Sequence, residues 1–221
     1  ISILISMSKK FCVYLIGTLP LALVAGPFVG ELFLFIIFSV FLFYLVKEKL
    51  YKIFNNKYFI FFLIFCFYLS VLSFFSSEIL ISAKSSFFYF RFGLYTLAII
   101  YFLTKIDNSL FIIYNIYKLT LLFIILDSLF QNFFGFNFFG IKPDTNNLMR
   151  ISGPFGDKFV LGSFLQKILP IFIYLIIKNY QISNKIKISD IIIVILVFSL
   201  IYRSGDRSAL GLIILFSFIF F

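Results

Sequence analysis

The chain has 221 residues, of which 62% are hydrophobic and only 13% charged, and its mean hydropathy is +1.12. A chain of this length cannot bury so much apolar surface in a water-soluble fold. The net charge of +10 comes mainly from lysines in short connections, which favours topogenic and headgroup charge over nucleic-acid binding. Histidine is absent, which excludes His-based triads and the usual zinc sites, and we expect no metal or cofactor.

Long uncharged runs divide the chain into candidate membrane spans. The runs are continuous rather than alternating, so they predict helices and not a barrel. We expect an all-α, polytopic transmembrane helical bundle forming a single domain over 1–221. About eight spans are expected, at 11–28, 32–46, 58–75, 87–103, 111–130, 164–177, 191–202 and 209–221. The chain starts at Ile1 and stops inside an apolar run at Phe221, which predicts a fragment of a longer protein.

The connections differ in length and composition. Gly26-Pro27 and Gly30 are expected to separate the first two spans, and Pro20 to kink the first. We interpret 76–86 as a polar connection. The segment 131–163 is much longer than a usual loop, and such loops are mostly functional or disordered. Its many phenylalanines favour packing on the membrane surface or folding back over the bundle.

Lysine positions predict the sidedness of the chain. With Lys9 and Lys10 in the cytoplasm and the spans alternating, eleven lysines fall on the inner side and four on the outer side. This distribution follows the positive-inside rule, and the inverted topology would reverse it. We therefore expect a multi-pass protein of the bacterial inner membrane, with a cytoplasmic N-terminus and a periplasmic loop at 131–163.

The four arginines show the opposite distribution. Arg150, Arg203 and Arg207 are expected outside, and Arg91 lies near the outer end of its span. Guanidinium binds phosphate or carboxylate with two parallel hydrogen bonds and cannot be deprotonated in proteins. The cluster therefore predicts an anionic ligand at the outer leaflet, such as a lipid-linked phosphate or pyrophosphate.

Structural explanations for these charges remain open. Arg203 and Arg207 could pair with Asp206, and Arg91 could pair with Asp127 inside the bundle. Asp157 and Asp127 are the carboxylates best placed to act as a base near the arginines. They could equally pair with arginine or cap a helix, just as the glycines of the loop could simply make turns.

Several segments, taken in order, resemble the O-antigen ligase and O-antigen polymerase superfamily. They are Asp127-Ser-Leu-Phe-Gln131, Phe-Gly-Phe-Asn-Phe-Phe-Gly140, Arg150-Ile-Ser-Gly-Pro-Phe-Gly-Asp157, Leu161-Gly-Ser-Phe-Leu with Pro170, and Ser204-Gly-Asp-Arg207-Ser-Ala. The likeness covers most of the chain, although no single segment is diagnostic.

The resemblance implies a metal-independent glycosyltransferase of the inner membrane. Such enzymes take a glycan from undecaprenyl pyrophosphate at the periplasmic face and pass it to another lipid-linked glycan or to the lipid A core. Periplasmic arginines are thought to hold the pyrophosphate, and Arg150 and Arg207 match such positions, with Arg203 a weaker match. Two departures stand out. Gly162 misses by one position the polymerase spacing of glycine after arginine, and the histidine expected of ligases is absent.

Two other classes of function remain open. A transporter or flippase of lipid-linked sugars or anions would carry charges along a path from both sides of the bilayer. Here the inner half of the spans carries little charge apart from Lys118, which favours an enzyme at the outer face. A non-catalytic assembly subunit would tolerate substitution of the arginines.

Overall fold

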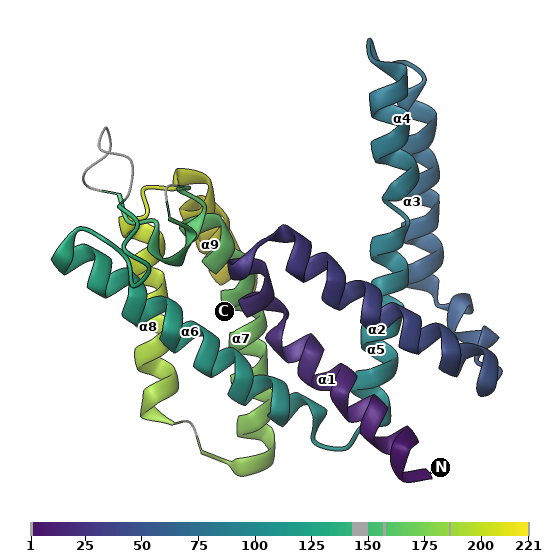
Figure 1. Cartoon of the computed structure of the whole chain (residues 1–221), viewed down its shortest axis with the longest axis horizontal. Helices are drawn as coiled ribbons and strands as arrows, with labels where there is room; N and C mark the ends of the chain where they lie inside the picture. Colours follow the sequence, from purple (N-terminus) through teal and green to yellow (C-terminus); the bar gives the residue numbers. More distant parts are fainter. Residues whose placement is uncertain (1, 143–149, 157, 186, 221) are drawn as a thin grey trace. The chain divides into compact units, whose positions relative to one another are not determined.

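The computed structural model describes residues 2–142, 150–156, 158–185 and 187–220, and within these ranges it contains helices but no strand. The chain divides into two compact units (Figure 1). Unit 1 comprises 1–16 and 28–109, and unit 2 comprises 17–27 and 110–221. Five helical segments are long and apolar enough to cross a membrane: Met7–Ala25, Pro27–Lys47, Ile79–Lys105, Ser109–Phe134 and Leu161–Ile182. This finding is consistent with a multi-pass membrane protein.

Two long helices, α1 (Ser2–Ala25) and α2 (Pro27–Lys47), open the chain. Gly26 separates them with a φ of 145°, and Pro27 is the first residue of α2, where proline's missing N–H costs nothing. The expected break at Gly30 is wrong, because that glycine is buried inside α2. The C-terminal part of α1 belongs to unit 2, where Gly17 packs against Ile116.

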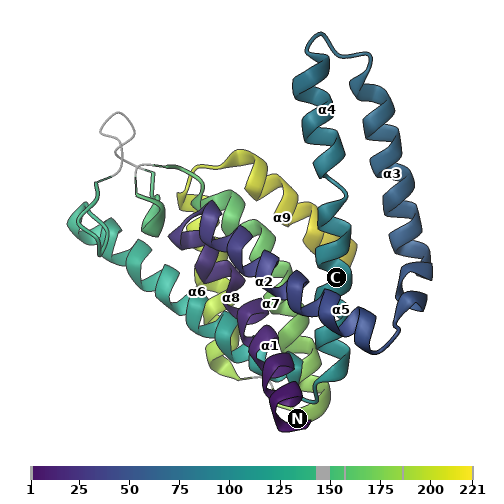
Figure 2. The ribbon, with the colours of Figure 1, turned by 45° about the vertical axis from the view of Figure 1, so that its right-hand side comes forward.

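Unit 1 continues through a 3₁₀ turn (Tyr51–Asn55) and α3 (Lys57–Ser73), α4 (Ile79–Phe88) and α5 (Arg91–Lys105). Helix α3 packs along α4 and α5 as an antiparallel hairpin (Figures 1 and 2). The expectation that 76–86 is a connection is wrong from Ile79 onward, because the run Ile79-Leu-Ile-Ser-Ala favours helix once the short Ser76-Ser77 turn has reversed the chain. Buried aromatic rings of α2 and α5 pack together in the core of this unit, and they are Phe41, Tyr44, Tyr101 and Phe102.

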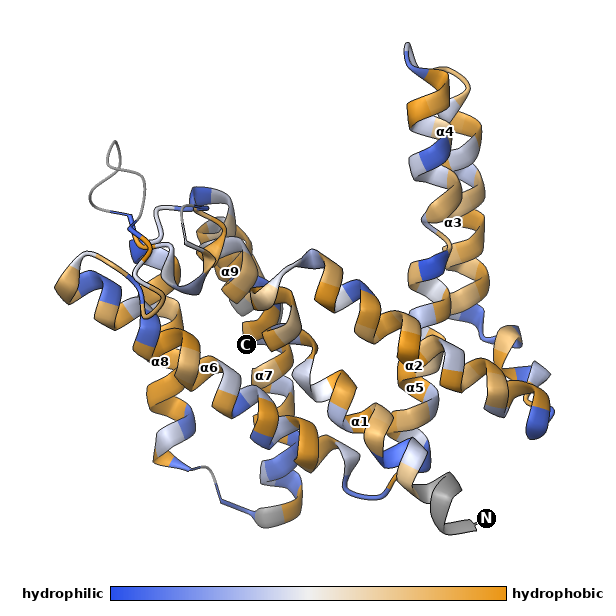
Figure 3. Ribbon diagram, in the orientation of Figure 1, coloured by the Kyte–Doolittle hydropathy of each residue, from blue (hydrophilic) through white to orange (hydrophobic). Residues whose placement is uncertain are grey.

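Unit 2 contains α6 (Ser109–Phe134), α7 (Leu161–Ser183), α8 (Ile188–Arg203) and α9 (Arg207–Phe220). Helix α7 packs against both α8 and α9, and Tyr114 of α6 stacks on Phe172 of α7 with ring centroids 6.1 Å apart. Helix α7 is longer than the expected span at both ends, and Asn184 ends it in the left-handed conformation that closes many helices. Hydrophobic residues dominate the helices, whereas hydrophilic residues mark the α7–α8 connection and the α8–α9 turn (Figure 3).

Candidate anion-binding site

The loop after α6 is anchored by one buried glutamine. Gln131 accepts hydrogen bonds from the backbone amides of Ser152 (2.9 Å) and Gly153 (2.7 Å) at a single oxygen, and its Nε2 donates to Ser152 Oγ (2.9 Å). Ser152 Oγ in turn donates to the carbonyl of Gly156. Buried polar groups need such partners because unpaired ones are costly. Gln131 therefore fixes the returning end of the loop against the end of α6.

A second buried amide shapes the outgoing end of the same loop. Asn137 Oδ1 accepts from the amides of Phe139 (3.1 Å) and Ile141 (2.8 Å), and Nδ2 donates to the carbonyl of Gly153 (3.2 Å). Gly153 has a φ of 56°, and a Cβ there would lie 2.5 Å from Ser128 Oγ, so only glycine fits. The described part of the loop thus folds back onto α6. Folding back over the bundle is one of the two outcomes expected for this segment from its sequence.

Asp127 serves the same fold. Its side chain is fully buried, and Oδ1 accepts from the amide of Phe138 at 2.7 Å. It does not pair with Arg91, which contacts Glu31 instead. A carboxylate without exposed surface does not reach an acceptor hydroxyl in this conformation, so the geometry gives Asp127 a loop-anchoring role. The other candidate base, Asp157, lies outside the described residues.

The returning loop places Arg150 on the turn between α8 and α9. Arg150 Nε donates to the carbonyl of Ser204 at 2.8 Å, and its guanidinium carbon lies 4.7 Å from the centre of the Phe159 ring. Gly205 has a φ of 68°, and a Cβ there would lie 3.0 Å from Arg150 Nε. The glycine therefore allows both the turn and the close approach of the arginine.

Gly162 brings the start of α7 to the same turn. A Cβ at this position would overlap Ser204 Oγ and lie 2.7 Å from Asp206 Cβ. Glycine at 162 is thus explained by contact between α7 and the α8–α9 turn. Gly162 therefore has a defined packing role, although it lies one position away from the glycine of the O-antigen polymerase pattern.

We call Arg150, Arg203 and Arg207, together with 204–206, the arginine turn. Arg203 is the last residue of α8 and Arg207 the first residue of α9, and both side chains are exposed. Among the described residues no ion pair involves any of these three arginines, so the expected pairing with Asp206 is not found. A cation at Arg207 stands at the positive end of its helix dipole, where an anion is favoured and a cation is not.

Asp206 caps α9 instead. Its Oδ1 accepts from Ser208 Oγ (2.7 Å) and from the amide of Ala209 (3.2 Å). The hydrogen bond from Ser208 lowers the pKa of Asp206 below its ordinary value; partial burial opposes this shift, while backbone amides and the charge of Arg150 add to it. The one carboxylate in the arginine turn is hydrogen-bonded to the first turn of α9 and feels the charge of Arg150, but it forms no ion pair with the three guanidinium groups.

The opposite end of α8 is built differently. Asp190 is only 2% exposed and accepts from Lys118 Nζ (2.6 Å) and from the Tyr114 hydroxyl (2.7 Å). The lysines of the α7–α8 connection lie at this end, so unit 2 separates a lysine end from an arginine end across α8. The sequence identified Lys118 in its span but did not predict its partner.

Of the residues predicted for the site, the structure brings Arg150 to the turn that carries Arg203 and Arg207. Arg91 lies in unit 1, where Nη2 is 3.1 Å from Glu31 Oε1. The sequence reasoning missed the roles of Gln131, Asn137 and Gly205. The signal for Gln131 was present, because Asp127, Ser128 and Gln131 lie on one face of α6 directly after an uncharged run.

The described residues contain no group of three or more His, Cys, Asp or Glu side chains that could hold a metal ion. Arg150 contacts the glycine turn that Arg203 and Arg207 flank, and guanidinium is the side-chain group best suited to anions with several oxygens. No family model matches the chain, and no curated protein or solved structure matches it either.

Proposed function

We propose that the arginine turn holds the pyrophosphate of a lipid-linked glycan at the periplasmic face of a bacterial inner membrane, in a protein whose N-terminus is cytoplasmic. The protein would transfer the glycan to another lipid-linked glycan or to the lipid A core, as the resemblance to the O-antigen polymerases and ligases implies. The observation that carries this proposal is the meeting of Arg150 with Arg203 and Arg207 at one turn without a carboxylate partner among the described residues.

The three arginines have distinct parts in this proposal. Arg150 is held at Nε by the Ser204 carbonyl, so both of its terminal nitrogens stay available for a phosphate. Arg203 and Arg207 are exposed and flank the same turn. Guanidinium groups at this turn would stabilise the negative charge that develops on the pyrophosphate as it leaves, which is where electrostatic catalysis acts most strongly.

The acceptor hydroxyl needs a group that orients or deprotonates it. Asp157 remains our candidate, because it lies in the chain between Arg150 and α7. Asp127 remains in the proposal only as the anchor of the loop that presents Arg150. Arg91 lies in unit 1 with an acidic partner, Glu31, and takes no part in holding the pyrophosphate.

The test is transfer by the reconstituted protein from an undecaprenyl-pyrophosphate-linked glycan. Replacing Arg150 or Arg207 with lysine keeps the charge but removes the pair of parallel hydrogen bonds that guanidinium makes to phosphate. We expect each substitution to lower the transfer rate at least about a hundredfold. The control is Lys167→Gln, which removes an exposed cation from α7 of the same unit. Its rate should equal that of the unmodified protein.

Two results would overturn the proposal. Full transfer activity in both lysine variants would show that the arginines do not clamp the donor and would favour an assembly subunit. Movement of the labelled donor across the vesicle without transfer would favour the transporter alternative. In the structure the charges at the other end of α8 are paired with each other, Lys118 and Asp190, rather than left open along a path.

A further inference from the structure

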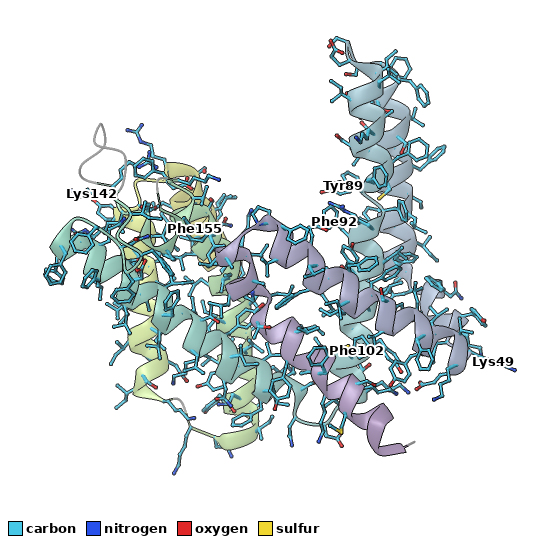
Figure 4. The ribbon with its side chains drawn as sticks, viewed as in Figure 1. Lys49, Tyr89, Phe92, Phe102, Lys142 and Phe155 are labelled. Atoms are coloured by element: carbon cyan, nitrogen blue, oxygen red, sulfur yellow. The ribbon has the colours of Figure 1, made fainter. Side chains whose placement is uncertain are left out.

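An open hollow lies where α4 meets α5 in unit 1. It has a volume of about 370 Å³ and is lined by Lys84, Ser85, Phe88, Tyr89, Arg91 and Phe92. Helix α4 ends at Phe88 and α5 begins at Arg91, and Figure 4 shows Tyr89 and Phe92 at this junction. The spacing of Lys84, Phe88 and Arg91 places two cations and one ring along the same side of the helix pair.

The two cations of the hollow keep unused hydrogen-bond donors. Lys84 is exposed and has no ion-pair partner among the described residues. Arg91 gives one donor to Glu31 at 3.1 Å, while its Nε is buried and has no acceptor. Arginine has five N–H donors, so an ion pair through one nitrogen leaves most of them free. A buried N–H without an acceptor is costly, so this donor is open to a further acceptor.

Ser85 adds little to this site, because its hydroxyl already donates to the carbonyl of Ile81 (3.1 Å). Glu31 holds Arg91 from the side of α2, and it balances only one of the two positive charges. The hollow therefore has a net positive charge. Lys84 and Arg91 both offer hydrogen-bond donors there, which suits one anionic group.

The surroundings of the hollow are apolar. Phe88 and Phe92 in its wall are exposed, and so are Leu80 and Phe87 on the same helix pair. The segment Ile79–Lys105 is also one of the five candidate membrane spans. Lysine and arginine in such segments extend toward lipid headgroups, and charged side chains there mark binding sites by default. A small soluble anion needs no such apolar rim, whereas the phosphate of a lipid does.

We propose that this hollow binds the phosphodiester of an anionic glycerophospholipid, with Lys84 and Arg91 as the donors and Glu31 orienting Arg91. The acyl chains would lie along the exposed phenylalanines. This lipid site lies in unit 1 and does not depend on the function proposed for the arginine turn.

The test uses native mass spectrometry of the full chain with phosphatidylglycerol and phosphatidylcholine that have the same acyl chains. The unmodified protein should retain phosphatidylglycerol in preference to phosphatidylcholine. Lys84→Gln should reduce this preference about fivefold, which is the usual effect of one basic residue near an anionic lipid. The matched control, Lys52→Gln, removes an exposed lysine of the same unit and should leave the preference unchanged.

A second arm distinguishes the lipid from a soluble anion. Inorganic phosphate or pyrophosphate in millimolar excess should not displace the bound phosphatidylglycerol. Displacement would assign the hollow to a soluble anion and overturn the lipid proposal. Equal retention of the two lipids, or equal behaviour of Lys84→Gln and Lys52→Gln, would also overturn it. Circular dichroism of each variant verifies that helical content is retained.

Discussion

The two units differ in which of their cations form ion pairs. In unit 1, Lys9 and Lys105 share Glu48, and Arg91 contacts Glu31. In unit 2, Lys118 is paired with Asp190 at one end of α8, whereas no ion pair involves the arginines at the other end among the described residues. The number of positive charges is therefore a poor guide to function. The ion pairs join helices, whereas Lys84 in unit 1 and Arg150, Arg203 and Arg207 in unit 2 form no ion pair among the described residues and are the candidates for ligand binding.

The carboxylates that pair with lysine in the two units also differ in burial. Glu48 keeps 29% of its side-chain exposure, but Asp190 keeps only 2%. We expect Lys118→Met to destabilise the protein by about 3 kcal/mol, because it leaves a buried carboxylate without its cation. Lys9→Met should cost about 1 kcal/mol or less, because Glu48 is more exposed and retains Lys105. Unfolding in detergent, followed by circular dichroism, measures both, and equal costs would contradict the difference.

The next effect concerns the backbone of the arginine turn. Gly205→Ala should destabilise the protein by about 2 kcal/mol, because alanine is strained at a φ of 68° and its Cβ would press on Arg150. The control is Gly211→Ala, a helical position in α9 with no atom within 4 Å of the added Cβ. That change should stabilise the protein slightly. The same unfolding measurement serves here, and a neutral Gly205→Ala would show that the turn is not constrained by Arg150.

A carboxylate placed beside Arg203 would make unit 2 resemble unit 1. Ser199 is exposed one helical turn before Arg203, and Ser199→Glu creates a pair of the favourable orientation. We expect affinity for a pyrophosphate-containing donor to fall about tenfold, which corresponds to about 1.4 kcal/mol. Ser199→Gln, similar in size but uncharged, should bind normally. Loss of binding in both variants would indicate a steric effect rather than occupation of the guanidinium.

The smallest effect is a pH dependence. The folded-state pKa of Asp206 is lowered, so its ionised form stabilises the fold above the unfolded pKa of about 3.9, and this contribution is lost as pH falls through the folded pKa. Asp206→Asn keeps a capping side chain but removes the charge. The difference in unfolding free energy between the two proteins should be under about 1 kcal/mol at neutral pH and should vanish in acid. A difference that grows in acid would contradict this sign.

Apolar length was enough to predict most of the helices, because a membrane-compatible run leaves few alternatives to helix. Apolar length was a less reliable guide to the ends of helices, which single residues determine. Pro27 starts α2 and Gly30 continues it, although both residues usually interrupt helices. The segment from Ile79 was predicted as a connection because it contains serine, yet α3 provides a partner along which it can pack.

The site was predictable in its residue types but not in its contacts. The arginines stand out because lysine is the usual cation of this chain. Nothing in the sequence, however, distinguishes Arg91 from Arg203, and only the structure shows that the former has Glu31 beside it. The role of Gln131 depends on two amides about twenty positions away, which no local pattern reveals.

Helix α8 has sixteen residues, which gives it a length of about 24 Å. The hydrocarbon layer of a typical bilayer is about 30 Å thick, so α8, which is not among the five candidate spans, is several ångströms too short to cross it unaided. A bilayer around unit 2 would have to thin, or the arginine turn would lie below the level of the headgroups. Under the proposed function, membrane thickness would then control how far the charged head of the donor must move to reach Arg150, Arg203 and Arg207.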